Sequence, residues 1–292
     1  MDYLYEVLLP QAVDGLVIAS ALVLVALGLT LIFGLLRVIN IAHGELYMLG
    51  AYVAFSVASL GGPFWLGLLM APLVVGVVGV AVERLCLQPL AGRRDHAILS
   101  LLLTYGLSLI LRDFAHVVWG LDTQRLAPPI TGALTLGSLA FSNYRLLVFA
   151  VAAVAIVSAW WLLYRTMAGA VLRATAFDRE MVAALGIPVR RVQMGTFFAG
   201  SALAAVAGVL LAPIYAIFPG MGHDFVLLAF AVIIVGGIGS VVGAVVAGVL
   251  LVEVQSLGSL IMRPVWAETL VFAVMIAVLV VRPNGLFNRL GS

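Results

Sequence analysis

Eight apolar stretches, each long enough to cross a lipid bilayer, make up most of this 292-residue chain. A helix needs about 20 apolar residues to span the hydrocarbon core. Lipid offers no hydrogen bonds to a free backbone, so stretches of this kind fold as helices. The alternating strands of a membrane β-barrel are absent from the sequence. The stretches lie at about 13–35, 41–60, 63–83, 97–115, 144–163, 192–213, 225–252 and 265–281.

The composition fits a protein that lies almost entirely within a membrane. Hydrophobic residues make up 64% of the chain and charged residues only 10%, and no window is both long and polar enough for a soluble domain. Residues 1–292 are therefore expected to form one domain, an all-α integral membrane protein with a polytopic bundle of about eight transmembrane segments. The single cysteine, Cys86, excludes an internal disulfide and any metal site built from several cysteines.

The chain has no means of binding ATP through a P-loop. All 15 of its basic residues are arginines, whereas the P-loop motif requires a lysine. If the protein works with ATP, a partner subunit must supply the nucleotide site.

The arginines predict which loops face the cytoplasm, because short cytoplasmic loops are enriched in basic residues. The connections at about 84–94 and 164–191 hold three and five arginines. Two spans separate these connections, so both lie on the same side. The connection at 120–143 holds only Arg125 and is expected outside.

The glycines within 225–252 predict a broken helix. Unbroken, these 28 residues would extend about 42 Å, well beyond a hydrocarbon core of about 30 Å. A break would make the segment partly re-entrant and would return Arg282 to the cytoplasmic side, where the arginine rule expects it. The residues at the break are Gly236, Gly237, Gly239 and Ser240.

The most polar sequence among the apolar stretches runs from Gly34 to Gly50. Ionisable side chains in a membrane segment face a water-filled path or the bundle interior, because facing lipid is costly. Helical spacing places four residues on one face, namely Asn40, His43, Gly44 and Tyr47. Glu45 is offset from this face. We interpret these residues as lining or gating a translocation path. The alternative is an ordinary cytoplasmic turn between two helices, with Glu45 as a cap.

Glycine-interrupted apolar segments thus occur in both halves of the chain, at 42–50 and 235–243. Paired interruptions indicate a substrate path in transporters, because unwound backbone is tolerated where it lines a cavity. The four residues of the second break therefore join the candidate path. The alternative is a pair of independent helix kinks.

Other small and polar residues suggest packing or interfacial positions. Rows of small residues four apart allow helices to approach closely in a membrane. Two groups of polar residues, one after the stretch at 97–115 and one before that at 225–252, are expected at the outer surface. The rows are Gly50/Ala54/Ala58, Gly200/Ala204/Gly208 and Gly239/Gly243/Ala247, and the polar groups are Arg112/Asp113/His116 and His223/Asp224.

The arginine-rich connection at 164–191 contains a second informative pattern. The apolar residues Phe177, Met181, Ala184 and Leu185 follow helical spacing, which predicts a short amphipathic helix over about 174–187. The other face holds Asp178, Arg179 and Glu180, and Gly186 ends the helix. A short charged helix with an apolar ridge suits docking into a groove of a soluble partner. The alternative is a helix that lies on the membrane surface.

These motifs together resemble a known family. The core Asn40-x-Ala42-His43-Gly44-Glu45 closely resembles the signature of the permease subunits of branched-chain amino-acid ABC importers, the LivH type. Three more segments and the ending Arg282-Pro283-Asn284-Gly285 are similar too, and they occur in the same order along nearly the whole chain. The segments are Asp178–Gly186, Ala204–Leu210 and Gly236–Ser240. The loop departs from the common Glu-Ala-Ala coupling pattern, because Met181 and Val182 follow Glu180.

The resemblance implies an assembly in the bacterial inner membrane. Two permeases form the channel, with a longer sister permease as the second subunit of a heterodimer. Two cytoplasmic ATPases dock on the loop helices and carry ATP and Mg, and a periplasmic binding protein delivers leucine, isoleucine or valine. No cofactor, metal, catalytic residue or nucleic-acid partner is expected for this chain.

Three alternatives remain open at this point. The closest is an ABC permease for urea, short amides or other amino acids, since relatives of the same architecture handle such solutes. A stand-alone secondary transporter would use Glu45 and His43 to bind a coupling proton. The third is an intramembrane enzyme, but no paired-aspartate, Ser/Lys or His-x-x-x-His site lies on any expected span.

Overall fold

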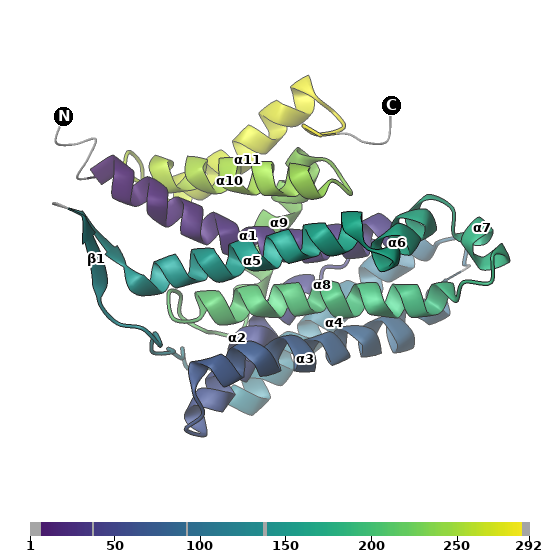
Figure 1. The fold of residues 1–292 in the computed structure, drawn as a ribbon, viewed down its shortest axis with the longest axis horizontal. Coiled ribbons are helices and arrows are strands. Elements are labelled where there is room, and N and C mark those ends of the chain that lie inside the picture. Colours follow the sequence, from purple (N-terminus) through teal and green to yellow (C-terminus); the bar gives the residue numbers. More distant parts are fainter. Residues whose placement is uncertain (1–6, 37, 92, 137–138, 288–292) are drawn as a thin grey trace.

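The protein is an elongated bundle of helices, seen in a computed structural model that describes residues 7–36, 38–91, 93–136 and 139–287 (Figure 1). The first helices are α1 (Leu9–Leu36), α2 (His43–Ser59), α3 (Phe64–Val82) and α4 (His96–Trp119). A π-helical turn (Glu83–Leu87) and a 3₁₀ turn (Gln88–Leu90) continue α3. The remaining helices are α5 (Asn143–Arg165), α6 (Met167–Phe177), α7 (Arg179–Ala184), α8 (Val189–Leu211), α9 (Met221–Gly236), α10 (Val241–Gly258) and α11 (Pro264–Val281).

The expectation of an all-helical polytopic membrane protein is confirmed. Within the described residues, seven helices are long and apolar enough to cross a membrane. They are α1, α3 with its continuation, α4, α5, α8, α10 and α11. Two further apolar helices, α2 and α9, have 17 and 16 residues. The connection expected outside also holds an element not predicted, an antiparallel hairpin of β1 (Ala133–Leu136) and β2 (Leu139–Ser142).

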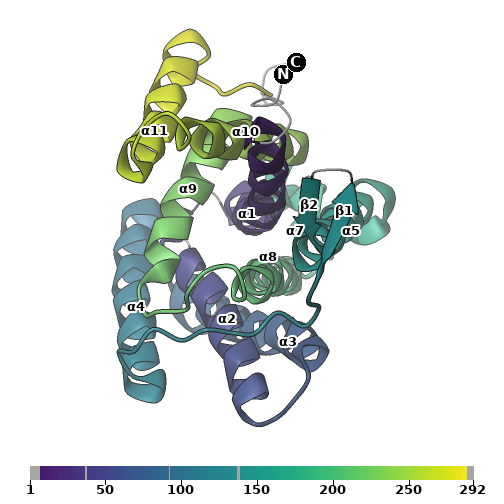
Figure 2. The same ribbon diagram turned by 90° about the vertical axis from the view of Figure 1, so that its left-hand side faces the viewer.

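Helix α1 lies at the centre of the bundle. Its middle is apolar on all sides and almost fully buried from Ala19 to Ile32, as expected for a helix with protein around its whole circumference. It packs against α5, α8, α9 and α10. Figure 2, viewed along the long axis, shows these helices around it. The outer helices α4, α5 and α11 bury few residues.

Small residues set the helix crossings, as the rows in the sequence predict. A methyl group on Gly28 of α1 would meet the carbonyl oxygen of Gly200 of α8. On α2, a methyl group on Gly50 would meet the backbone of Ala205 of α8. Without side chains at these points, the backbones approach closely enough for extensive van der Waals contact, which holds helices together in lipid.

The predicted break in the second half is present and divides the stretch at 225–252 into α9 and α10. Helix α10 runs antiparallel to α1. The Gln11 side chain near the start of α1 donates to the Ser256 carbonyl at 3.0 Å, whereas Gly34 near its end lies beside Gly239. Four helices, α8 to α11, therefore follow the arginine-rich connection at 164–191. An even number of helices returns the tail to the same side of the bundle as that connection. This resolves the conflict between the arginine rule and three unbroken spans.

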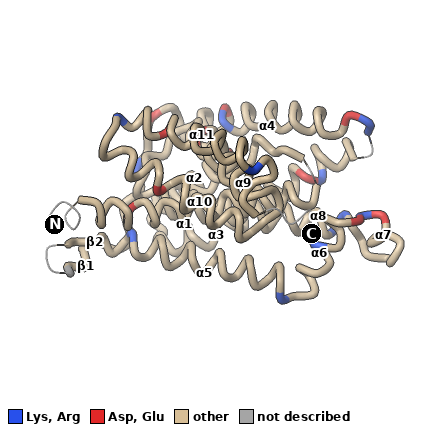
Figure 3. The backbone as a smooth tube through the Cα atoms, turned by 90° about the horizontal axis from the view of Figure 1, so that it is seen from above, with Lys and Arg blue, Asp and Glu red and all other residues tan. Residues whose placement is uncertain are grey.

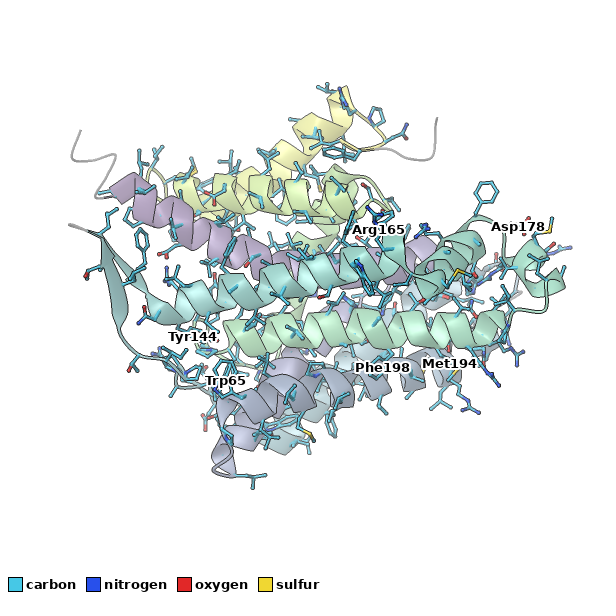
Figure 4. All side chains as sticks on the ribbon, viewed as in Figure 1. Trp65, Tyr144, Arg165, Asp178, Met194 and Phe198 are labelled. Carbon is cyan, nitrogen blue, oxygen red and sulfur yellow. The ribbon has the colours of Figure 1, made fainter. Side chains whose placement is uncertain are left out.

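The two ends of the bundle differ in the way the arginine distribution predicts. The loop after α3 and the segment α6–α7 lie at one end, whereas the hairpin and the start of α1 lie at the other (Figure 1). Charged residues gather mostly toward the two ends and the middle is largely free of them (Figure 3). In Figure 4, Arg165, Asp178 and Met194 lie toward the first end, and Trp65 and Tyr144 toward the second. We call these the inner and outer ends.

Candidate functional site

The polar stretch does not form a turn at the membrane surface, because α2 begins inside the bundle. His43, its first residue, is fully buried, and its Nε2 lies 3.1 Å from the carbonyl oxygen of Val25, in the middle of α1. A carbonyl only accepts, so Nε2 carries the proton and Nδ1 is free to accept. Nδ1 has no partner among the described residues. The connection between α1 and α2 therefore folds back into the bundle.

Asn40 corrects one part of the sequence interpretation. It lies before the first turn of α2 and so does not share a helical face with His43 and Tyr47. The short connection around it is held by α4, where the Thr104 hydroxyl donates to the Ile39 carbonyl at 3.3 Å. Asn40 is fully buried, and its amide oxygen and nitrogen have no partner among the described residues. Burying an amide without hydrogen bonds is costly, which marks this position as a candidate for a polar occupant.

Two more residues of the predicted path, both on α2, have polar atoms without a hydrogen-bond partner among the described residues. Glu45 is 4% exposed and its Oε2 has no hydrogen bond with a described residue, and the same holds for the hydroxyl of the fully buried Tyr47. Native proteins satisfy most buried polar groups, so such exceptions call for an explanation. The first turns of α2 thus bring polar groups without a described partner into the interior of the bundle.

Gly44 allows α9 to lie directly against this turn. A methyl group on Gly44 would clash with the carbonyl oxygen of Gly222, and a methyl on Gly222 would lie 2.8 Å from Oε2 of Glu45. One turn further, the ring of Tyr47 stacks on Phe225 of α9 with centroids 4.3 Å apart. The two short helices of the bundle thus meet at the polar stretch.

The second predicted group of path residues forms the turn between α9 and α10. Gly236 packs against Gly243, and the Ser240 hydroxyl caps α10 by accepting from the Gly243 amide at 3.0 Å. Gly237 and Gly239 have φ angles of 96° and 83°, which disfavour any residue with a side chain. All four residues therefore have a structural role in the turn.

The tail of the chain completes this turn. The amides of Leu286 and Phe287 donate to the carbonyls of Val235 and Gly236 at 2.8 and 3.1 Å. These are carbonyls at the end of α9, which no further turn of that helix can satisfy. Gly285, with a φ of 80°, lies against Gly237. We call this contact between residues 285–287 and the end of α9 the tail clasp.

The turn after α9 and the start of α2 lie apart, at different depths of the bundle. Gly239 neighbours the end of α1, whereas His43 neighbours its middle. A cleft of about 700 Å³ separates Ile238 and Gly239 from α6, with Arg173 and Phe177 on its opposite side. The second group of path residues therefore borders the arginine-rich loop segment.

The loop segment contains two helices, so the single amphipathic helix predicted over 174–187 is wrong. Helix α6 ends at Phe177, and Asp178 begins α7 by accepting from the Met181 amide at 2.9 Å. Phe177 therefore does not share a helix with Met181 and Leu185. These three side chains are nevertheless 89%, 60% and 72% exposed, and Gly186 ends the segment with a φ of 79°.

Most of α7 faces away from the bundle. Val182 is buried, whereas Arg179, Glu180 and Ala184 are exposed. Figure 1 shows α7 at the extreme inner end. A six-residue helix that exposes both its apolar residues and its charges fits a surface that a partner covers.

Sequence reasoning missed the contact between α4 and the polar start of α2. Arg112 was expected in a separate outer cluster with Asp113 and His116. It does lie 3.9 Å from Asp113, but its side chain also reaches Gly220, at the start of α9. The charges of Arg112 and Asp224 both act on the Glu45 carboxylate. No local pattern connects residues so distant in sequence.

No metal centre is found in the part of the chain that the structure describes. It contains no group of three or more histidine, cysteine, aspartate or glutamate side chains placed to hold an ion.

Comparison with known proteins decides the family. The family model described as "Branched-chain amino acid transport system / permease component" matches residues 11–279. The chain belongs to this permease family.

Several known proteins are similar to this chain over most of its length. The high-affinity branched-chain amino acid transport system permease protein BraD of Pseudomonas aeruginosa is 32% identical over 96% of each chain. LivH of Escherichia coli is 30% identical, also over 96% of each chain. A more distant relative, the autoinducer 2 import system permease protein LsrC of Yersinia pseudotuberculosis, is 28% identical over 85% of this chain and 70% of its own. An inward-facing metal-chelate type ABC transporter aligns over 94% of this chain and 87% of its own, with a TM-score of 0.44 and 16% identity.

The permease is thus the membrane-spanning component of an ABC transporter and has several transmembrane helices. The family resemblance noted in the sequence is confirmed. The roles of the individual path and loop residues stay predictions.

Proposed function

We propose that the permease imports branched-chain amino acids as one of two membrane subunits of an ABC transporter. In this assembly a periplasmic binding protein delivers leucine, isoleucine or valine. Two cytoplasmic ATPases bind and hydrolyse ATP, and the second membrane subunit is a longer sister permease. The observation that carries the proposal is the match of residues 11–279 to the permease family.

The geometry of the inner end supports ATPase docking on α6 and α7. Phe177, Met181 and Leu185 present apolar side chains to the surroundings at the end of the bundle that holds the arginine-rich loops. Beyond that end lies the cytoplasm according to the arginine rule. An apolar ridge on a short helix fits a groove on a soluble protein.

We further propose that the docked segment acts on the path through the turn after α9. The cleft of about 700 Å³ places Phe177 and Arg173 opposite Ile238 and Gly239. Movement of α6 toward or away from α9 would open or close this cleft. Asn40, His43, Gly44, Glu45 and Tyr47 would line or gate the path deeper in the bundle, with Gly236, Gly237, Gly239 and Ser240 at its inner part.

Purification of the tagged permease from its native membrane in mild detergent tests the proposal. The expected result is a complex that contains two ATPases and a second permease. Its ATP hydrolysis should be stimulated by a binding protein loaded with leucine. If only a binding protein loaded with urea or a short amide stimulates ATP hydrolysis, the substrate class is urea or amides and not branched-chain amino acids. A lone chain that moves solute along a pH gradient would establish a proton-coupled carrier instead.

A further inference from the structure

A cavity of about 500 Å³ lies at the outer end of the bundle, between α1, α9, α10 and α11. Its position follows from its lining: Gln11 near the start of α1, Asp224 in the first turn of α9 and Glu268 in the second turn of α11. Small-molecule sites range from about 300 to 1,000 Å³. The cavity is therefore large enough for a single amino acid.

Two carboxylates give the cavity a negative charge. Asp224 and Glu268 both line it, and neither forms an ion pair with a described residue. The lining residues include no arginine. Both side chains are exposed, so they lie where the cavity opens to the surface, and two carboxylates at its mouth attract a cation.

The remaining walls are suited to an aliphatic group and to a hydrogen-bond acceptor. Leu22, Leu228 and Val252 supply an apolar surface from three helices. Gln255 also lines the cavity, and its side-chain amide forms no hydrogen bond with a described residue. An amide N–H₂ donates to a carboxylate oxygen. An ammonium group, an aliphatic side chain and a carboxylate would each find a complementary surface.

An unsatisfied polar group lies behind one wall of the cavity. Phe225 forms part of the lining and stacks on Tyr47, whose hydroxyl is buried and without a partner in the described part of the chain. On the cavity side, Tyr215 meets Phe225 edge-on, with centroids 5.8 Å apart. Phe225 therefore separates the cavity from the polar start of α2, the first group of candidate path residues.

We propose that this outer cavity is the first substrate subsite of the permease and that it selects solutes with a protonated amino group. Asp224 and Glu268 bind the ammonium group, the apolar wall contacts the aliphatic side chain, and Gln255 donates to the carboxylate. Phe225 closes the cavity toward Tyr47. The proposal rests on the proposed import function and assigns its substrate class to amino acids over urea and short amides.

Cysteine labelling tests the selectivity without requiring transport. In the assembled complex lacking the binding protein, Cys86→Ser removes the native thiol and Ala216→Cys places a reporter in the cavity lining. Maleimide labelling is measured with millimolar leucine, 3-methylbutylamine, 4-methylpentanoate or urea. The first two carry an amine and should slow labelling at least about threefold, as expected at two-thirds occupancy. The last two should leave the rate unchanged.

Two controls fix the interpretation. A reporter introduced by Leu60→Cys, at a residue that is 89% exposed and outside the cavity lining, should label at the same rate with every solute. Asp224→Asn combined with Glu268→Gln should abolish protection by leucine, whereas Asp113→Asn, an exposed carboxylate on α4, should retain it. Protection by urea or 4-methylpentanoate equal to that by leucine would overturn the proposal, as would the absence of any protection.

The labelling result separates this proposal from the import function. Amine-dependent protection in a complex that no loaded binding protein stimulates would leave the subsite standing and overturn the import function. Leucine import without amine-dependent protection would overturn the subsite alone.

Discussion

Gly44 of α2 lies against the backbone of Gly222 of α9, so closely that a methyl group on either residue would overlap the other. The contact joins the two shortest of the apolar helices that build the bundle core, and it borders Glu45 and Tyr47. It therefore fixes the geometry of the candidate path.

Gly44→Ala should destabilise the permease. The new methyl would overlap the Gly222 carbonyl and would lie 2.7 Å from Cβ of Val226. Overpacking of this kind costs about 1–3 kcal/mol. The melting temperature of the detergent-purified protein should fall. Gly106→Ala is the matched control, because no atom lies within 4 Å of a methyl group there and alanine favours a helix. An unchanged melting temperature in Gly44→Ala would contradict the close contact.

The tail clasp predicts that Gly285→Ala impairs the inner end of the bundle. Alanine disfavours the φ of 80°, and its methyl would lie 2.7 Å from the Gly237 amide nitrogen. Hydrogen exchange at the amides of Leu286 and Phe287 should accelerate. Gly120→Ala has the same conformational penalty at a φ of 83° but open space around it, so it should leave those amides protected. Equal protection in both variants would show that the clasp does not depend on Gly285.

Replacing the Asp178 side chain should loosen α7. Asp178→Ala removes the acceptor of the Met181 amide, and loss of such a cap costs about 1 kcal/mol. Hydrogen exchange within α7 should speed up about fivefold, the factor that corresponds to this energy. Asp178→Asn keeps an acceptor and should exchange as slowly as the wild type. Faster exchange in both variants would assign the effect to charge and not to capping.

Leu185→Ser should weaken ATPase docking without destabilising the permease. Leu185 is 72% exposed, so its replacement removes little buried surface within this chain. The amount of ATPase that co-purifies should decrease while the melting temperature stays constant. Leu60→Ser, at an exposed residue in the connection after α2, should co-purify the normal amount. Normal ATPase recovery with Leu185→Ser would exclude this residue from the docking surface.

Glu45→Gln should impair transport while assembly stays intact. The substitution keeps the size of the side chain but removes a charge that lies within reach of the fields of Arg112 and Asp224. Uptake is measured at matched expression, with co-purification of the partners as the assembly test. Asp113→Asn, whose carboxylate is 71% exposed, is the control. Wild-type uptake by Glu45→Gln would remove Glu45 from the path.

Features with a local signal in the sequence were predictable. The apolar stretches gave the helices, and the glycines at 236–239 marked the break, because a 28-residue helix would overrun the bilayer. The arginines predicted that the connections at 84–94 and 164–191 lie at the same end of the bundle. Each of these signals lies within one segment of the chain.

Two errors arose where helical spacing was followed across the point at which a helix begins. Asp178 is a typical N-cap residue, and it begins a new helix in the middle of the spacing that joined Phe177 to Leu185. Asn40 likewise precedes the first turn of α2. At Asp178, N-capping outweighed the helical spacing. At Asn40, the fold of the short connection between α1 and α2 outweighed it.

The sites built from distant segments were not predictable from the sequence. Gln11 and Glu268 line one cavity although most of the chain lies between them. Arg112, Gly220 and Glu45 come together from three helices. These residues lie on different helices, so only the packing of the helices brings them together, and one sequence contains no record of that packing.

The central position of α1 has a consequence for biosynthesis. The ribosome makes this helix well before its neighbours α8 and α10, and Gln11 bonds to Ser256 across an interval of 245 residues. Helix α1 must therefore wait in the membrane, with the faces that α8 and α10 later cover still exposed, until those helices have been synthesised. A chain that stalls after α7 would lack α8, α9 and α10 and would leave the faces of α1 that they cover exposed to lipid.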